Sequence, residues 1–187
     1  MTVLLVYVDD IVLTGNNILE IEKVKQFLCT KFLIKDLGKL KYFLGIEVVK
    51  SDKGLCLSQS KYCLELLSDF GLLGSKHVST PLESNITIHH VDNRCDNDLP
   101  LSNITEYQKL IGKLIYLTLT RSDISYTVQC ISQYMHAPLT SHLKIALRLL
   151  RYLKTAPEKG ILFSKCENLS LNTLVDCNWV KCITSRR

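Results

Sequence analysis

Two adjacent carboxylates, Asp9 and Asp10, interrupt an otherwise apolar N-terminal segment. The runs 3–6 and 11–13 on either side are short and rich in β-branched residues and leucine, which predicts two strands joined by a tight turn at the acids. Successive side chains of a strand point to opposite faces, so only a turn lets neighbouring carboxylates reach one place. Because a divalent cation would offset their charge, the pair suggests a metal site.

A polar, solvated turn that binds no metal is the alternative interpretation of this acid pair, because aspartate is common in turns. Asp-Asp is nevertheless a poorer two-residue turn than Asn-Gly or Asp-Gly, which supply the positive φ angles that such turns need. Turn formation alone therefore does not explain why these two acids stand here, and both interpretations stay open.

The residues around the acids resemble the reverse transcriptase of copia-type long-terminal-repeat retrotransposons. Residues 4–15, LLVYVDDIVLTG, are similar to the second catalytic palm motif of that family, and residues 36–48 are similar to its primer-grip segment. Further matching segments follow in the family's order and spacing, at residues 57–62, 80–81, 107–112, 120–126 and 149–154. The resemblance spans nearly the whole chain.

This resemblance implies a two-metal polymerase site. In such enzymes carboxylates hold two Mg²⁺ or Mn²⁺ ions, which activate the primer 3′-hydroxyl and neutralise the triphosphate and the leaving pyrophosphate. Asp9 and Asp10 would then be catalytic metal ligands, while Phe43, Leu44 and Gly45 would hold the primer terminus. The implied partners are an RNA/DNA primer–template duplex and deoxynucleotides.

The C-terminal segment 174–179 resembles the first strand of the family's ribonuclease H domain, with Asp176 at the first catalytic carboxylate. Asn178 stands where the family usually has a second acid. The family's other palm aspartate and the remaining ribonuclease H acids would lie outside the 187 residues. We therefore expect both sites to be incomplete and the isolated chain to be an inactive fragment. The alternative is a non-enzymatic remnant or a nucleic-acid-binding module.

Composition favours a globular chain, with 47% hydrophobic and 22% charged residues. No run of eighteen apolar residues and no basic signal-peptide start occurs, which predicts an intracellular, cytoplasmic protein without a membrane segment. The eight cysteines form no Cys-x-x-Cys pair, so neither a zinc site nor a disulfide partner is expected.

The hydrophobic spacing, with the resemblance, predicts an α+β fold. A partial palm with antiparallel hairpins and the primer-grip hairpin should occupy residues 1–57. It should contain a helix capped by Asn16 or Asn17, one strand over 42–49 and a second over 54–57, joined by a turn at residues 52–54.

The remaining chain should be mostly helical, with a short C-terminal β segment. The predicted parts are the start of a thumb (58–75), a linker or irregular loop (76–104), a helical thumb/connection (105–160) and a truncated ribonuclease H-like start (161–187). The expected helices run from Gln59 to Phe70 before a Gly71 cap, from a Thr105 capping box to about Leu119, from an N-cap at Ser122 or Asp123 to about Met135, and from an N-cap at Thr140 to Lys154.

Nucleic-acid contacts are predicted at two places. On the predicted helix 140–154, Lys144, Arg148 and Arg151 are spaced by four and three residues, which gathers their charges on one face that could follow phosphates. The resemblance adds Tyr7, beside the acid pair. The formal net charge of +5 agrees with an acidic partner, although a merely solvated basic face is the open alternative.

Overall fold

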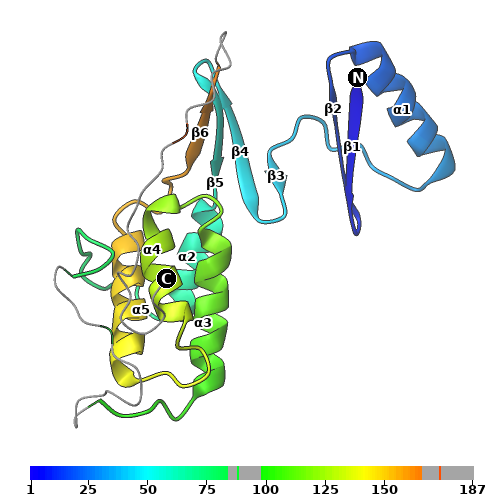
Figure 1. Cartoon of the computed structure of the whole chain (residues 1–187). Helices are drawn as coiled ribbons and strands as arrows, with labels where there is room; N and C mark the ends of the chain where they lie inside the picture. Colours follow the sequence, from blue (N-terminus) through cyan, green and yellow to red (C-terminus); the bar gives the residue numbers. More distant parts are fainter. Residues whose placement is uncertain (84–87, 89–97, 166–172, 174–187) are drawn as a thin grey trace. The chain divides into compact units, whose positions relative to one another are not determined.

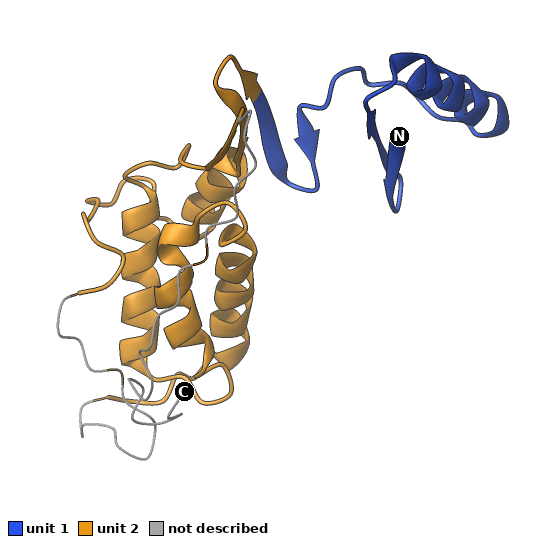
Figure 2. Ribbon diagram, turned by 45° about the horizontal axis from the view of Figure 1, so that its top comes forward, with its two compact units in different colours: residues 1–49 blue, residues 50–187 orange. Residues whose placement is uncertain are grey.

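The computed structural model describes residues 1–83, 88, 98–165 and 173, and the chain divides into two compact units (Figure 2). Unit 1 comprises residues 1–49 and unit 2 residues 50–187. Helices and antiparallel strand pairs occur together, which confirms the α+β class. Among the described residues, no helix is both long enough and apolar enough to cross a membrane.

Unit 1 begins with the predicted hairpin, in which β1 (Thr2–Tyr7) pairs antiparallel with β2 (Asp10–Gly15). Helix α1 (Ile18–Lys31) follows and contacts β2. Asn17 caps α1, because its side chain accepts the backbone N–H groups of Leu19 and Glu20 at 3.0 and 3.4 Å. The predicted strands, helix and cap are confirmed.

The single strand predicted over 42–49 is wrong, because the chain reverses direction inside it. β3 (Tyr42–Phe43) pairs antiparallel with β4 (Ile46–Ser51) across the two residues Leu44 and Gly45. Their φ angles, +49° and +77°, are both positive, as a type I′ turn requires. An apolar run without a polar turn residue hid this reversal from the sequence.

The second sheet has the strand order β3-β4-β5-β6. Its third strand, β5 (Gly54–Ser58), follows β4 after the predicted turn at residues 52–54. Its last strand, β6 (Ile161–Ser164), comes from the far end of the described chain and pairs antiparallel with β5. The boundary between the two units falls within β4.

Unit 2 is dominated by helices (Figure 1). Their bounds are α2 Ser60–Asp69, α3 Ile104–Leu117, the 3₁₀ turn η2 Ser122–Ile124, α4 Ser125–Ser132 and α5 Thr140–Leu153. The predicted helices are present, but the one expected from Ser122 to Met135 starts as a 3₁₀ turn and ends three residues earlier. Gly71 has a φ of +64°, as expected for a left-handed cap after α2.

Two predicted N-caps are corrected. Asn103, rather than Thr105, caps α3: its Oδ1 accepts the backbone N–H of Glu106 at 3.1 Å, and its amide donates to the Glu106 carboxylate at 3.0 Å. At α5, Leu139 rather than Thr140 takes the N-cap position. The Thr140 hydroxyl instead donates to the Asp98 carboxylate (2.8 Å), which also accepts the Ser141 backbone N–H (2.9 Å). Sequence spacing missed Asp98 because it lies about forty residues from the helix.

The hydrophobic core lies entirely in unit 2. All buried hydrophobic side chains among the described residues fall between Cys63 and Leu153, on α2, α3, α4, α5 and their connections. No side chain of unit 1 is buried, and β1 exposes apolar residues along its length, with Leu5 53% accessible. The predicted domain boundaries within this architecture stay predictions.

Candidate functional site

The acid pair lies at the tip of the β1–β2 hairpin. Tyr7 and Asp10 form the last Cα pair of the two strands, so the connecting residues are Val8 and Asp9. The turn is therefore shifted by one residue from the prediction, and Asp10 is the first residue of β2. Asp9, Asp10 and Tyr7 are all exposed, so both carboxylates are accessible to a cation and its water ligands.

Val8 has an unusual backbone conformation within this turn. Its φ is +49°, whereas that of Asp9 is not positive, a combination that resembles a type II′ turn. Glycine is the usual first residue of such a turn, and a β-branched residue there costs about 1–3 kcal/mol. Residues in strained conformations persist only where the surrounding structure holds them in place, and they cluster at functional sites.

The donor chemistry of the pair fits Mg²⁺ or Mn²⁺. Both cations prefer hard oxygen ligands, and Mg²⁺ is usually held by one or two carboxylates together with waters and substrate phosphates. Asp9 and Asp10 would supply the carboxylates. Within the described ranges, no three His, Cys, Asp or Glu residues gather into a cluster that could hold a metal ion on its own.

The predicted primer-grip residues form the tip of another hairpin. Phe43 ends β3 and is half-buried opposite Ile46, while Leu44 and Gly45 are the two turn residues with positive φ. The acid pair and this turn both lie in unit 1 but on separate sheets. The structure therefore places each predicted group at a tight reversal of the chain.

The predicted basic face of α5 is partly engaged within the chain. The Arg148 guanidinium donates to Glu83 Oε1 at 2.8 Å and to Thr80 Oγ1 at 3.0 Å, and its side chain is only 20% exposed. Lys144 is exposed and Arg151 is half-buried. Phosphate binding by these three residues stays a prediction, and the contacts of Arg148 argue against its part in it.

The partners of Arg148 belong to a segment that we call the α5 strap, residues 75–83. Lys154 Nζ donates to the Ser75 carbonyl at 2.6 Å, and the Thr155 hydroxyl donates to the Val78 carbonyl at 3.1 Å. The Val78 N–H in turn donates to the Arg151 carbonyl at 3.4 Å. This described part of the predicted linker is therefore fastened along α5.

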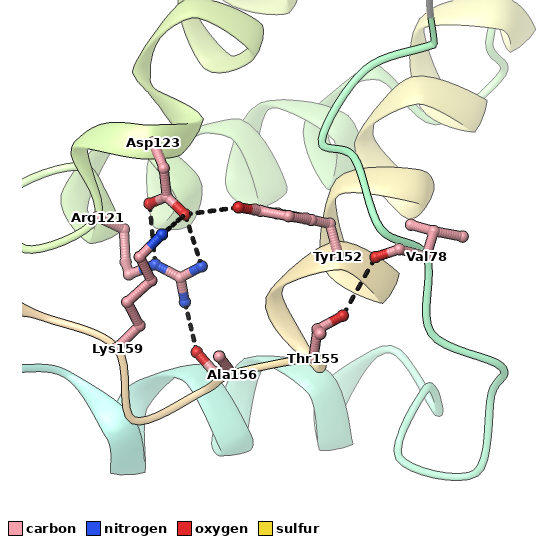
Figure 3. A network of polar contacts seen from close by, with 7 residues as sticks. All are labelled: Val78, Arg121, Asp123, Tyr152, Thr155, Ala156 and Lys159. Atoms are coloured by element: carbon pink, nitrogen blue, oxygen red, sulfur yellow. Dashed lines mark hydrogen bonds and ion pairs between the residues drawn. The ribbon is translucent and has the colours of Figure 1, made fainter.

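A polar network that sequence reasoning missed joins the start of η2 to the end of α5 (Figure 3). Arg121 is 2% exposed and donates through two nitrogens to the two carboxylate oxygens of Asp123, each at 3.0 Å. Its third nitrogen donates to the Ala156 carbonyl at 2.8 Å. Tyr152 (2.8 Å) and Lys159 (3.1 Å) also donate to Asp123.

Electrostatics keep this network ionised. Burial alone would raise the pKa of the Asp123 carboxyl, but hydrogen bonds from Arg121, Tyr152 and Lys159 outweigh burial and hold that pKa well below its usual range. The sequence predicts Ser122 or Asp123 as a helix cap, but Asp123 lies inside η2 and its carboxylate belongs to this network. Its partners Tyr152 and Lys159 are about thirty residues away, and no local pattern identifies them.

Asp176 and Asn178, the predicted ribonuclease H positions, lie outside the described residues.

Comparison with known proteins identifies the class to which this architecture belongs. The family model described as reverse transcriptase (RNA-dependent DNA polymerase) matches residues 2–84. The chain is 40% identical over 178 residues to the retrovirus-related Pol polyprotein from transposon RE2 of Arabidopsis thaliana, and this match covers 94% of the chain and 12% of the relative. It is 32% identical over 158 residues to the Pol polyprotein from transposon TNT 1-94 of Nicotiana tabacum, covering 81% and 12%.

An uncharacterized mitochondrial protein of Arabidopsis thaliana is 36% identical over 184 residues, which cover 98% of this chain and 74% of that protein. No solved structure matches significantly. The chain belongs to the reverse transcriptase (RNA-dependent DNA polymerase) family of copia-type retrotransposon Pol polyproteins. It spans about 12% of the length of the Pol polyproteins that it matches.

Proposed function

We propose that this chain is the palm-to-thumb part of a retrotransposon reverse transcriptase and contributes Asp9 and Asp10 to RNA-directed DNA synthesis. The observation that carries the proposal is the exposed acid pair at a strained hairpin tip, within the segment matched by the reverse transcriptase model. Exposed carboxylates at a chain reversal can bind a cation from solvent, and the cation can in turn bind substrate phosphates.

The proposed mechanism gives each residue one task. Asp9 and Asp10 would hold the divalent ions, and the turn at Val8 fixes the backbone between Tyr7 and Asp10. When bound, Mg²⁺ or Mn²⁺ would favour the ionised primer hydroxyl and neutralise the nucleotide phosphates. The Leu44–Gly45 turn, with Phe43, orients the primer terminus. Because the turn is rigid, little further conformational entropy of the protein is lost when the primer binds.

The finer assignments belong to the same proposal. Residues 1–57 act as palm, 58–75 as the start of the thumb, 105–160 as thumb and connection, and 161–187 as the start of a ribonuclease H-like domain with Asp176 as its first acid. The primer–template duplex and deoxynucleotides are the proposed partners, and the cytoplasm is the proposed location.

A second candidate function is nucleic-acid binding without catalysis by the 187 residues alone. It is favoured because the described residues offer the metal two adjacent carboxylates and no third ligand group beside them. Phosphoryl transfer depends chiefly on the positioning and charge of its metal ions, so a site with too few ligands should lose activity before it loses duplex binding.

Primer extension on an RNA template separates the two candidates. The 187-residue chain is assayed with Mg²⁺ or Mn²⁺ alone, and again after grafting into the RE2 Pol polyprotein in place of the aligned region. We expect no incorporation by the chain alone and incorporation by the graft. Asp9→Asn with Asp10→Asn should reduce the activity of the graft more than about 100-fold, since even outer-shell changes at metal sites cost 10- to 100-fold.

Asp52→Asn is the matched control, because Asp52 is an exposed turn aspartate of the β4–β5 hairpin. It should leave the activity of the graft unchanged. Equal losses in both variants would refute the metal role of the pair, whereas incorporation by the chain alone that depends on Asp9 and Asp10 would refute the non-catalytic candidate.

A further inference from the structure

The net charge of the chain is concentrated in one short segment of unit 1. Residues 23–41, which we call the lysine segment, contain six lysines and one aspartate, a formal charge of +5. The whole chain also has a formal charge of +5. The rest of the chain therefore carries equal numbers of positive and negative side chains, although α5 itself contains three cations and no acid.

Asp36, the one acid of the lysine segment, is already neutralised and folds the segment back onto α1. Its carboxylate lies 2.7 Å from the Lys25 ammonium, which also lies 3.7 Å from Glu22. The same carboxylate accepts the Gly38 backbone N–H at 2.8 Å, and Gly38 has a φ of +78°. The Lys25–Asp36 ion pair thus connects the loop to α1, and an Asx turn at Asp36 shapes the loop itself.

The other five lysines of the segment are exposed, and none makes a side-chain ion pair or hydrogen bond with any residue that the structure describes. They are Lys23, Lys31, Lys35, Lys39 and Lys41. The cations of α5 differ in this respect, since Arg148 and Lys154 donate to the α5 strap. The lysine segment is therefore the larger reserve of uncommitted positive charge.

We propose that the lysine segment binds the phosphate backbone of a nucleic-acid duplex, an inference that rests on the proposed function. Lysine ammonium groups act as point charges on flexible stems, and their binding to phosphates releases condensed counterions. The segment contains no arginine, the residue best suited to bidentate recognition of guanine. Binding should therefore tolerate any base sequence and weaken steeply with salt.

Two variants with the same change in net charge test this site. The first replaces Lys31, Lys35, Lys39 and Lys41 by glutamine, and keeps Lys25 and Asp36 so that the Asx turn survives. The control replaces four exposed lysines outside the segment by glutamine: Lys50, Lys53, Lys76 and Lys109. Fluorescence anisotropy measures the binding of each full chain to a labelled RNA–DNA duplex over a range of NaCl concentrations.

Each lost phosphate contact lowers the magnitude of the slope of log K against log salt by about 1. We expect the segment variant to lose about 3 to 4 from this slope and the control to lose less than about 1. Equal losses in the two variants, an unchanged slope in the segment variant, or no duplex binding by the unsubstituted chain would each overturn the proposal.

Polyglutamate of comparable length separates a nucleic-acid partner from an acidic protein. Weaker affinity of the unsubstituted chain for polyglutamate than for the duplex supports the proposal, and equal or greater affinity overturns the duplex as partner. The proposed polymerase function is judged separately, by incorporation in the grafted Pol polyprotein. Nucleotide incorporation by the graft, together with a segment variant that loses no more salt dependence than the control, would reject duplex binding by the lysine segment. That result would leave the proposed polymerase function standing.

Discussion

Arg121 and Asp123 form an ion pair whose members are 2% and 21% exposed. A pair of this kind is expensive to break from one side, because the surviving charge is left buried without a partner, at a cost of about 3–5 kcal/mol. Arg121 also donates to the Ala156 carbonyl, so its position fixes the chain that leaves α5. The Arg121–Asp123 ion pair therefore also holds the backbone at Ala156, directly after α5.

Asp123→Asn should lower the free energy of unfolding by about 3 kcal/mol, because it leaves the buried Arg121 guanidinium without a carboxylate. Urea denaturation followed by circular dichroism measures this change. Asp69→Asn is the control, since Asp69 pairs with Lys113 at the surface and exposed pairs are worth less than about 1 kcal/mol. Similar small losses in both variants would mean that the Asp123 network does not stabilise the fold.

The same carboxyl predicts a loss of stability in acid. The pKa of Asp123 is lower in the folded chain than its unfolded value of about 3.9. Its contribution is therefore fully present above pH ~4 and is lost as the pH falls toward the folded pKa. Urea midpoints between pH 2 and 7 should show the gap between the unsubstituted chain and Asp123→Asn narrowing below pH ~4. A gap that stays constant in acid would contradict the assignment.

Two hairpins of unit 1 turn at non-glycine residues with positive φ, Val8 and Leu44. At the β3–β4 hairpin, Gly45 takes the second positive φ without strain. The β1–β2 hairpin has no glycine at its tip, so Val8 bears the strain of the reversal. The acid pair therefore lies at the tip of a hairpin that strand pairing stabilises and the strained turn at Val8 destabilises.

Val8→Gly should stabilise the β1–β2 hairpin by about 1 kcal/mol, because glycine adopts positive φ without steric cost. Amide hydrogen exchange of β1 and β2 measures this, and protection should increase. Val3→Gly is the control, because Val3 lies within β1, where glycine weakens a strand; its protection should fall. Decreased protection in both variants would show that the turn is not the strained point.

Sequence periodicity was sufficient for the helices of unit 2 and for the β1–β2 hairpin, where apolar spacing and flanking polar residues agree. It failed at Leu44–Gly45, because an apolar run continues through a turn that only the backbone angles reveal. The contacts of Asp98 with the start of α5, and of Asp123 with Tyr152, join residues distant in sequence. Such contacts depend on tertiary packing, which local patterns do not specify.

The two units differ in how much they bury. Every buried hydrophobic side chain of the described residues belongs to unit 2, whereas β1 and α1 leave theirs partly or fully exposed. Since apolar burial is the main favourable contribution to folding, about 25 cal/mol per Å², cooperative unfolding of the chain should report chiefly on the helices. Hydrogen bonds of unit 1 should open at lower free energy.

Deletion of residues 1–41 should change the free energy of unfolding of the helical unit by less than about 0.5 kcal/mol, because none of its buried side chains is removed. Thermal and urea denaturation monitored at 222 nm test this. Leu114→Ala provides the contrast: Leu114 is fully buried, and its truncation should cost about 2–5 kcal/mol. A deletion that lowers the free energy of unfolding as much as Leu114→Ala does would refute the claim that unit 2 supplies most of the stability.

The pairing of β5 with β6 also constrains the order in which the chain can fold. Leu57 pairs with Ile161, and α2 through α5 all lie in the loop between these residues. Closing a flexible loop of about 100 residues costs roughly 4 kcal/mol of chain entropy. Prior packing of the helices shortens the effective loop, so we expect β6 to join the sheet after the helices have assembled and to leave it first when the molecule unfolds.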